Sequence, residues 1–170
     1  PVIIAVEIRR KEVRDPLTGK VRQRALAGRV RLRKLPNKSA ASVDRFMKDC
    51  IAPGAVITSD DGPEYTNLSA RGYVHHPVPM LGDRAKMDSY LPMVSTVTAN
   101  LKAWIDGTFH GVYKKHLQAY LNEFMFRFNR RFYRALSFRK LLGLGICRTG
   151  PTYRELYDGD WVHRENPHET

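Results

Sequence analysis

The segment "GAVITSDDGPEYTNL" (residues 54–68) decides the fold class, because a strand, an acidic pair and a turn follow one another in it. Residues 56–58 are β-favouring and run directly into two adjacent aspartates, Asp60 and Asp61. The Gly-Pro pair at 62–63 then ends any regular structure. A strand that ends in an acid places a carboxylate at the carboxyl edge of a sheet, where open α/β folds bind their ligands.

Further strands are predicted on both sides of this segment. They are expected at residues 2–8, 25–35, 55–59 and 73–78. The first is a continuous apolar run, which is typical of a strand buried on both faces. The second alternates arginine with apolar residues, which is typical of a half-exposed strand. Proline and glycine within residues 15–20 predict a hairpin turn between these two strands.

Helices are predicted between and after the strands from apolar residues that recur at helical spacing. They are expected at residues 39–51 (capped by Ser39), 68–72, 94–106, 113–134 and 137–146. Residues 79–93 carry two prolines and no clear period, and we expect a loop there. Alternating strands and helices predict a mixed α/β sheet covered by helices, over a domain at 1–146 with a polar tail at 147–170.

The composition predicts a polyanionic partner. The 170 residues hold 29 Lys and Arg against 17 Asp and Glu, a formal charge of +12, and the 42% hydrophobic content suffices for a core. Such a charge favours nucleic acid, with a membrane surface as the other candidate. No apolar run is long enough to span a membrane. Cys50 and Cys147 lack any CxxC spacing and predict reduced thiols in a cytoplasmic protein.

The acidic pair allows two interpretations. Asp60 and Asp61 follow a predicted strand, and Mg²⁺ is bound by one or two carboxylates together with substrate phosphates. Two such ions can assist an in-line phosphoryl displacement. The alternative is a polar turn, because aspartate favours turns by hydrogen bonding to its own backbone. Spacing alone leaves both interpretations open.

The region from Lys114 to Lys140 holds eight basic residues and one acid, Glu123. Arginine on a helix beside phenylalanines suits contact with a phosphate backbone, and a merely solvated helix face is the alternative. His110 lies in a predicted loop without a metal-ligand partner at zinc spacing, which favours a structural or phosphate-contacting role.

Three motifs, in this order, carry a family resemblance: "GAVITSDDGPEYTNL" (54–68), "NLKAWIDGTFHG" (100–111) and "KHLQAYLNEFMFRFNRR" (115–131). They resemble the transposase domain of a group of bacterial insertion sequences, which are DDE-type enzymes with an RNase H-like fold. The resemblance implies cleavage and strand transfer of DNA at insertion-sequence ends, with Mg²⁺ or Mn²⁺ held by an acidic triad. It also implies double-stranded DNA as partner, a homo-oligomer in a synaptic complex, and a cytoplasmic, nucleoid-associated location.

The resemblance assigns roles residue by residue. It places the second triad acid, a metal ligand, at Asp60 and the third position at Ser95, where the family has an acid, asparagine or histidine. Lys102 matches the basic residue that follows the third position by seven. The DNA-binding residues that we expect are Lys102, His110, Lys114, Lys115, Arg127, Arg130, Arg131 and Arg134.

The family's first acid lies on a strand that precedes the one resembling residues 2–10. We therefore expect this chain to be a C-terminal piece that lacks the first strand. Two alternative functions stay open: a DNA-binding transposase remnant without catalysis, and a basic RNA-binding protein.

Overall fold

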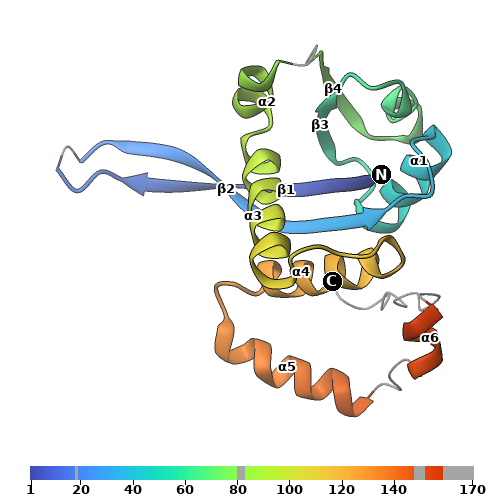
Figure 1. Cartoon of the computed structure of the whole chain (residues 1–170). Helices are drawn as coiled ribbons and strands as arrows, with labels where there is room; N and C mark the ends of the chain where they lie inside the picture. Colours follow the sequence, from blue (N-terminus) through green and yellow to red (C-terminus); the bar gives the residue numbers. More distant parts are fainter. Residues whose placement is uncertain (18, 80–82, 148–151, 159–170) are drawn as a thin grey trace. The chain divides into compact units, whose positions relative to one another are not determined.

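The computed structural model describes residues 1–17, 19–79, 83–147 and 152–158 (Figure 1). The chain divides into two compact units, Pro1–Trp104 and Ile105–Thr170, and each is described by itself. Strands and helices alternate in the first unit, and the second is helical. This confirms the predicted α/β class.

The first unit begins with a long antiparallel hairpin. Strands β1 (Val2–Arg14) and β2 (Val21–Lys34) pair along their lengths. The predicted turn at 15–20 is confirmed, because the Asp15 N–H donates to the Lys20 carbonyl at 2.9 Å. The prediction that β1 is buried on both faces was wrong: Ile3 is buried, but the strand is exposed from Glu7 onward. The apolar run is short, and the charged residues after it continue the strand beyond the core.

Helix α1 (Ala40–Cys50) organises the core of the first unit. Ser39 caps it as predicted, since its side chain accepts a hydrogen bond from the Ser42 N–H. The apolar face of α1 packs in one cluster with residues from both strand pairs. The buried members of this cluster are Ile3, Leu35, Val43, Phe46, Met47, Leu68 and Tyr73. Asp44, which is also buried, forms an ion pair with Arg71.

The second strand pair is parallel. β3 (Val56–Asp60) and β4 (Val74–Val78) are joined by two short 3-10 helices, η1 (Pro63–Tyr65) and η2 (Ser69–Arg71). β3, β4 and η2 match the strands and the short helix predicted there, whereas η1 begins at Pro63, where the end of regular structure was predicted. Within the described ranges, the four strands form two two-stranded sheets rather than the single mixed sheet that was predicted.

Two helices follow β4. The prediction of a loop over 79–93 was wrong in part, because α2 (Arg84–Tyr90) lies within it. Its prolines flank the helix instead of interrupting it, and the Asp83 side chain accepts from the Lys86 N–H at its start. Residues 80–82 of this stretch lie outside the described part of the chain. Helix α3 (Pro92–Phe109) is longer than predicted at both ends.

The second unit contains η3 (Lys114–His116), α4 (Leu117–Asn129), α5 (Arg134–Cys147) and α6 (Tyr153–Asp158). The single helix predicted over 113–134 is therefore shorter and separate from α5. It ends where the Arg130 N–H donates to the carbonyls of Arg127 and Phe128, a tightening typical of a helix end. The predicted domain boundary at residue 146 stays a prediction, and most of the predicted tail lies outside the described residues.

None of the helices that the structure describes combines the length and the apolar character that crossing a membrane would require.

The packing of α1 makes a stability prediction. Phe46 is 1% exposed at the centre of the core cluster. We expect Phe46→Ala to lower the free energy of unfolding by about 3–5 kcal/mol, because it removes buried apolar surface and leaves a cavity. Urea unfolding monitored by circular dichroism measures this loss. Leu17→Ala is the control, because Leu17 is 94% exposed in the hairpin turn; equal losses in both variants would contradict the assigned core.

Candidate metal centre and nucleic-acid interface

Asp60 is the last residue of β3, opposite Val78 at the carboxyl end of the parallel pair. The residue before it fixes the local backbone. Ser59 is buried, and its hydroxyl donates to the Asp60 carbonyl at 2.7 Å and lies 2.8 Å from Nε2 of His75 on β4. These contacts tie the two strands together beside Asp60, so His75 has a structural role here.

Glu64 is the acidic neighbour of Asp60. It lies in η1, after the Gly-Pro turn, and its negative charge acts on the Asp60 carboxyl. Partial burial raises the pKa of Asp60 above its ordinary value, and the charge of Glu64 raises it further, while Lys38 opposes the shift. A Cβ on Gly62 would lie 2.8 Å from Oε2 of Glu64, so this carboxylate folds back over the turn.

The charges of Asp60 and Glu64 also affect the pKa of Tyr65. Burial, followed by the charges of Asp60 and Glu64, raises the pKa of Tyr65 to about 12. Its phenol therefore stays neutral at physiological pH and adds no third negative charge. The negative charge of Glu64 thus acts on the Asp60 carboxyl, and the sequence analysis missed this neighbour. The sequence does show two acids four residues apart on either side of a tight turn. Whether such acids lie close together depends on the geometry of the turn, which the sequence does not give.

Ser95 and Lys102 lie on α3, seven residues apart. At 3.6 residues per turn this separation puts them on the same side of the helix. The buried residues Val97 and Leu101 lie on a different side of the helix, and Lys102 is exposed. The charged residues that shift the pKa of Asp60 are Glu64 and Lys38, and both lie outside α3. Among the residues described, no three His, Cys, Asp or Glu side chains gather to hold a metal ion.

The basic residues between α3 and α4 are exposed. His110 follows α3 with φ +52°, a left-handed conformation that is uncommon outside glycine, and Gly111 follows it. Lys114 and Lys115 belong to η3 and are exposed. The rings of Phe109 and Tyr120 pack edge to face, with their centroids 4.6 Å apart, at the two ends of this connecting segment. Lys114, Lys115 and His110 therefore lie on one short, braced segment.

The arginines near the end of α4 are held by neighbouring side chains. Arg127 forms an ion pair with Glu123 at 2.7 Å. The Arg130 guanidinium lies over the Phe126 ring at 4.0 Å, and that of Arg131 lies over both Phe128 (3.9 Å) and Phe132 (4.4 Å). The phenylalanines therefore position the guanidinium groups. Arg134 begins α5, and its side chain lies outside the described part.

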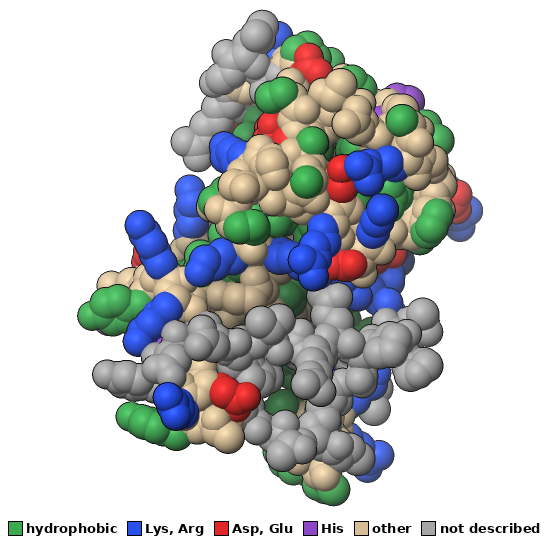
Figure 2. Space-filling view, turned by 90° about the vertical axis from the view of Figure 1, so that its right-hand side faces the viewer, with side chains coloured by type: hydrophobic (Ala, Val, Ile, Leu, Met, Phe, Trp, Pro, Cys, Tyr) green, Lys and Arg blue, Asp and Glu red, His purple; other side chains and the backbone are tan. Residues whose placement is uncertain are grey.

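Positive side chains are spread widely over the face drawn in Figure 2, among neutral and hydrophobic ones, with Asp and Glu fewer. This distribution agrees with the formal charge of +12. Many dispersed positive charges suit contact with an extended polyanion.

The fold defines a basic α/β protein with an aspartate at the end of a strand in its first unit and arginines stacked on phenylalanine rings in its second. The particular family follows from comparison with family models. The ISXO2-like transposase domain matches residues 1–129, and the chain belongs to this family. No curated protein and no solved structure matches the sequence.

The family match confirms the predicted membership among insertion-sequence transposases of the DDE type. It gives the chain a role in transposition. The DDE class implies use of divalent metal ions and a DNA partner.

The raised pKa of Asp60 predicts a cost to stability. Folding makes this carboxyl hold its proton more tightly, so Asp60 favours the folded state below pH about 3.9 and disfavours it once ionised. We expect Asp60→Asn to raise the melting temperature at pH 7 and to lose this advantage near pH 3. Asp61→Asn removes the same charge at the next position and serves as the control. A lower melting temperature for Asp60→Asn at pH 7 would contradict the assignment.

Proposed function

We propose that this chain cleaves and joins DNA phosphodiester bonds at insertion-sequence ends, with Asp60 as a metal ligand. The observation that carries the proposal is the position of Asp60 at the carboxyl end of a parallel strand pair, where the negative charge of Glu64 also acts on its carboxyl. A pair of like charges held together is unfavourable unless a proton or a cation neutralises it. The family match supports the reaction class, and Asp60 is the proposed place for it in this chain.

The residues present fit a hard divalent cation. Asp60 and Glu64 offer carboxylate oxygens, and Mg²⁺ is commonly held by one or two carboxylates and substrate phosphates. Mn²⁺ favours the same oxygen ligands. When bound, the ion would polarise a phosphoryl oxygen and assist formation of the attacking nucleophile. The hydrogen bonds of Ser59 hold the Asp60 backbone in place, so its carboxylate is presented from a rigid strand end.

The basic residues provide the DNA contacts in this proposal. Lys102 is exposed on the same side of α3 as Ser95, and His110, Lys114 and Lys115 follow on the braced segment. The planar guanidinium groups at the end of α4 are pre-positioned by aromatic rings, which lowers the entropy lost when they bind phosphate. Duplex DNA at the element ends and at the target is the proposed partner, within a homo-oligomeric synaptic complex.

An RNase H-like arrangement is part of the proposal. The first unit consists of an antiparallel hairpin, then a helix, then a parallel pair that bears Asp60. Its core supports the comparison, because α1 packs against residues from both strand pairs.

A second candidate is DNA binding without catalysis. A serine occupies position 95, and a neutral hydroxyl is a weaker ligand for Mg²⁺ than a carboxylate. This candidate shares the DNA-binding surface and differs only in chemistry, so a nicking assay separates the two.

The proposed metal ligand gives a direct test of catalysis. We expect the chain to nick a supercoiled plasmid carrying insertion-sequence ends only when Mg²⁺ or Mn²⁺ is present. Asp60→Asn should lower the rate by more than about 100-fold, because even outer-shell changes at metal sites cost 10–100-fold. Glu64→Gln should lower both the rate and the affinity for Mn²⁺ measured by calorimetry.

The control is Asp61→Asn, which should retain the rate. Metal-dependent nicking that survives Asp60→Asn would overturn the site. Absence of nicking together with tight DNA binding would favour the second candidate.

The braced segment predicts a salt-dependent contribution to DNA binding. We expect Lys114→Gln with Lys115→Gln to reduce the slope of log affinity against log salt, on every sequence tested. The reduction should be about 1 for each lysine that neutralises a phosphate in the unmodified chain. Fluorescence anisotropy with a labelled duplex over a salt series measures this slope. A slope equal to that of the unmodified chain would mean that the segment is only solvated.

A further inference from the structure

The outer part of the β1–β2 hairpin has no core of its own. It comprises Arg9–Arg14, the described turn residues 15–17 and 19–20, and Val21–Leu26, and we name it the arm. Figure 1 shows the arm extending away from the rest of its unit, and residues 9–14 and 21–25 are exposed on both faces. An isolated two-stranded ribbon is marginally stable in water. Packing within the unit therefore does not explain the length of the arm.

The two faces of the arm differ in charge. Residues paired across the strands share a face, and the register pairs Arg9 with Leu26, Lys11 with Arg24, and Val13 with Arg22. That face carries four basic side chains and no acid. The other face pairs Arg10 with Ala25, Glu12 with Gln23, and Arg14 with Val21, and it carries one acid.

The basic face includes a directly unfavourable pair. Lys11 lies opposite Arg24, and like charges at opposite positions destabilise an antiparallel pair. Arg22 adds a third positive charge on the same face. A polyanion that lies against this face would remove the repulsion, so the charge pattern favours the bound state over the free one.

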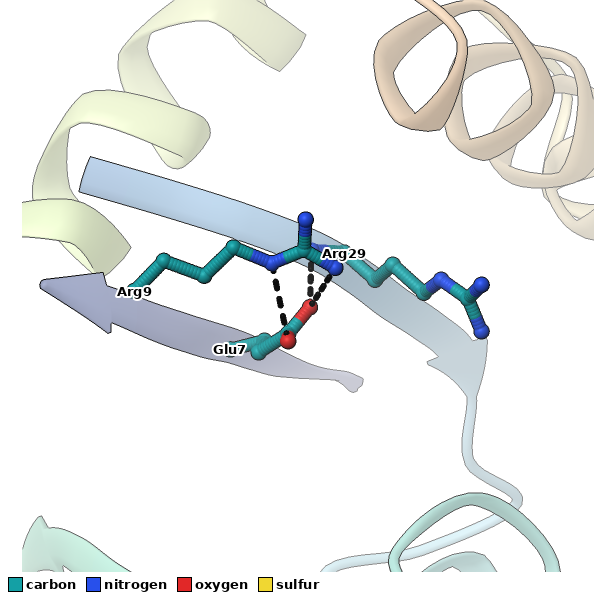
Figure 3. A network of polar contacts seen from close by, with 3 residues as sticks. All are labelled: Glu7, Arg9 and Arg29. Atoms are coloured by element: carbon teal, nitrogen blue, oxygen red, sulfur yellow. Dashed lines mark hydrogen bonds and ion pairs between the residues drawn. The ribbon is translucent and has the colours of Figure 1, made fainter. Parts of the chain in front are cut away.

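A β-bulge at the base of the arm sets its direction. The register shifts between Val6 and Ile8, so that Gly28 and Arg29 together oppose Glu7. The Glu7 carboxylate accepts hydrogen bonds from the Arg29 N–H at 2.8 Å and from the Arg9 side chain at 3.0 and 3.2 Å (Figure 3). A Cβ on Gly28 would lie 2.5 Å from Oε2 of Glu7, so glycine leaves room for this carboxylate.

The Glu7 contacts also have a consequence for charge. The hydrogen bond from Arg9 lowers the pKa of Glu7, with smaller contributions from the Arg29 backbone and from both positive charges. Glu7 is therefore ionised at neutral pH and neutralises part of the charge of Arg9. The basic face that remains for a partner consists of Lys11, Arg22 and Arg24, all exposed.

We propose that the arm binds duplex DNA, with Lys11, Arg22 and Arg24 on the phosphates. This proposal rests on the proposed function for the choice of DNA as the polyanion. Neighbouring strands lie about 4.8 Å apart, and a two-stranded ribbon of this kind fits the B-DNA major groove, which is about 12 Å wide. Leu17, which is 94% exposed at the tip, then contacts bases or sugars beyond the phosphates.

Removing the opposed charges tests the arm without weakening the fold. Lys11→Gln with Arg24→Gln relieves repulsion, so the melting temperature without DNA should stay equal or rise. Affinity for a labelled 30-base-pair duplex at 0.1 M salt should fall on the order of 10- to 100-fold, and the salt slope should fall by about 1.8. Leu17→Ser should lower the affinity several-fold and leave the slope unchanged, because it removes no charge.

The matched control is Arg45→Gln with Lys48→Gln on α1, which removes two exposed charges of the same unit at the same net charge. If this control loses as much affinity and slope as the arm variant, the effect is one of overall charge and the proposal is overturned. An arm variant that binds duplex DNA with unchanged slope also overturns it.

Other polyanions provide the last comparison. The major groove of A-form RNA is deep and narrow, so the arm substitutions should matter at least 10-fold less on duplex RNA. An equal effect on duplex RNA, or a larger one on vesicles containing phosphatidylserine, overturns the assignment to DNA. Nicking that requires Asp60 while the arm variant binds normally would refute the arm and leave the proposed function standing.

Discussion

The packing of one helix face holds the first unit together. Phe46 and its neighbours on α1 meet apolar residues of the hairpin, such as Ile3, and of the parallel pair's flanks, such as Leu68 and Tyr73. A parallel pair of two short strands has little stability alone, and so has a two-stranded hairpin. Both depend on burial against α1. The position of Asp60 therefore follows from α1, because β3 is fixed in the unit by this core.

The surroundings of Asp60 disfavour its ionised form. Asp60 is partly desolvated beside the charge of Glu64, and both effects raise its pKa. Functional sites commonly hold charge in such a way, with the cost offset by packing elsewhere. Ser59 and His75 make the arrangement rigid, since their hydrogen bond joins the strands next to the acid. A cation at this place would convert repulsion into attraction without moving the backbone.

Local signals predicted much of the fold, and long-range pairing could not be read from them. Ser39 gave the start of α1, and the alternation of 25–35 gave a half-exposed strand, because capping and period-two patterns depend on neighbours in sequence. The burial of β1 was overestimated, since an apolar run does not reveal how far its strand continues past the core. Asp60 could be singled out from its strand, whereas the proximity of Glu64 depended on the turn geometry. The division of the four strands into two separate pairs could also be seen only in the structure.

The positive charge is divided between two kinds of support, and the difference bears on what each can recognise. Directly after α4 the guanidinium groups of Arg130 and Arg131 rest on phenylalanine rings, which fixes their positions. On the arm the charges stand on an exposed ribbon whose repulsion is relieved only by a partner. A ribbon of this kind adds affinity through phosphate neutralisation and can follow a groove of variable sequence. The proposed function requires contacts with insertion-sequence ends of fixed sequence and with targets of varied sequence, and we propose one of these two kinds of support for each.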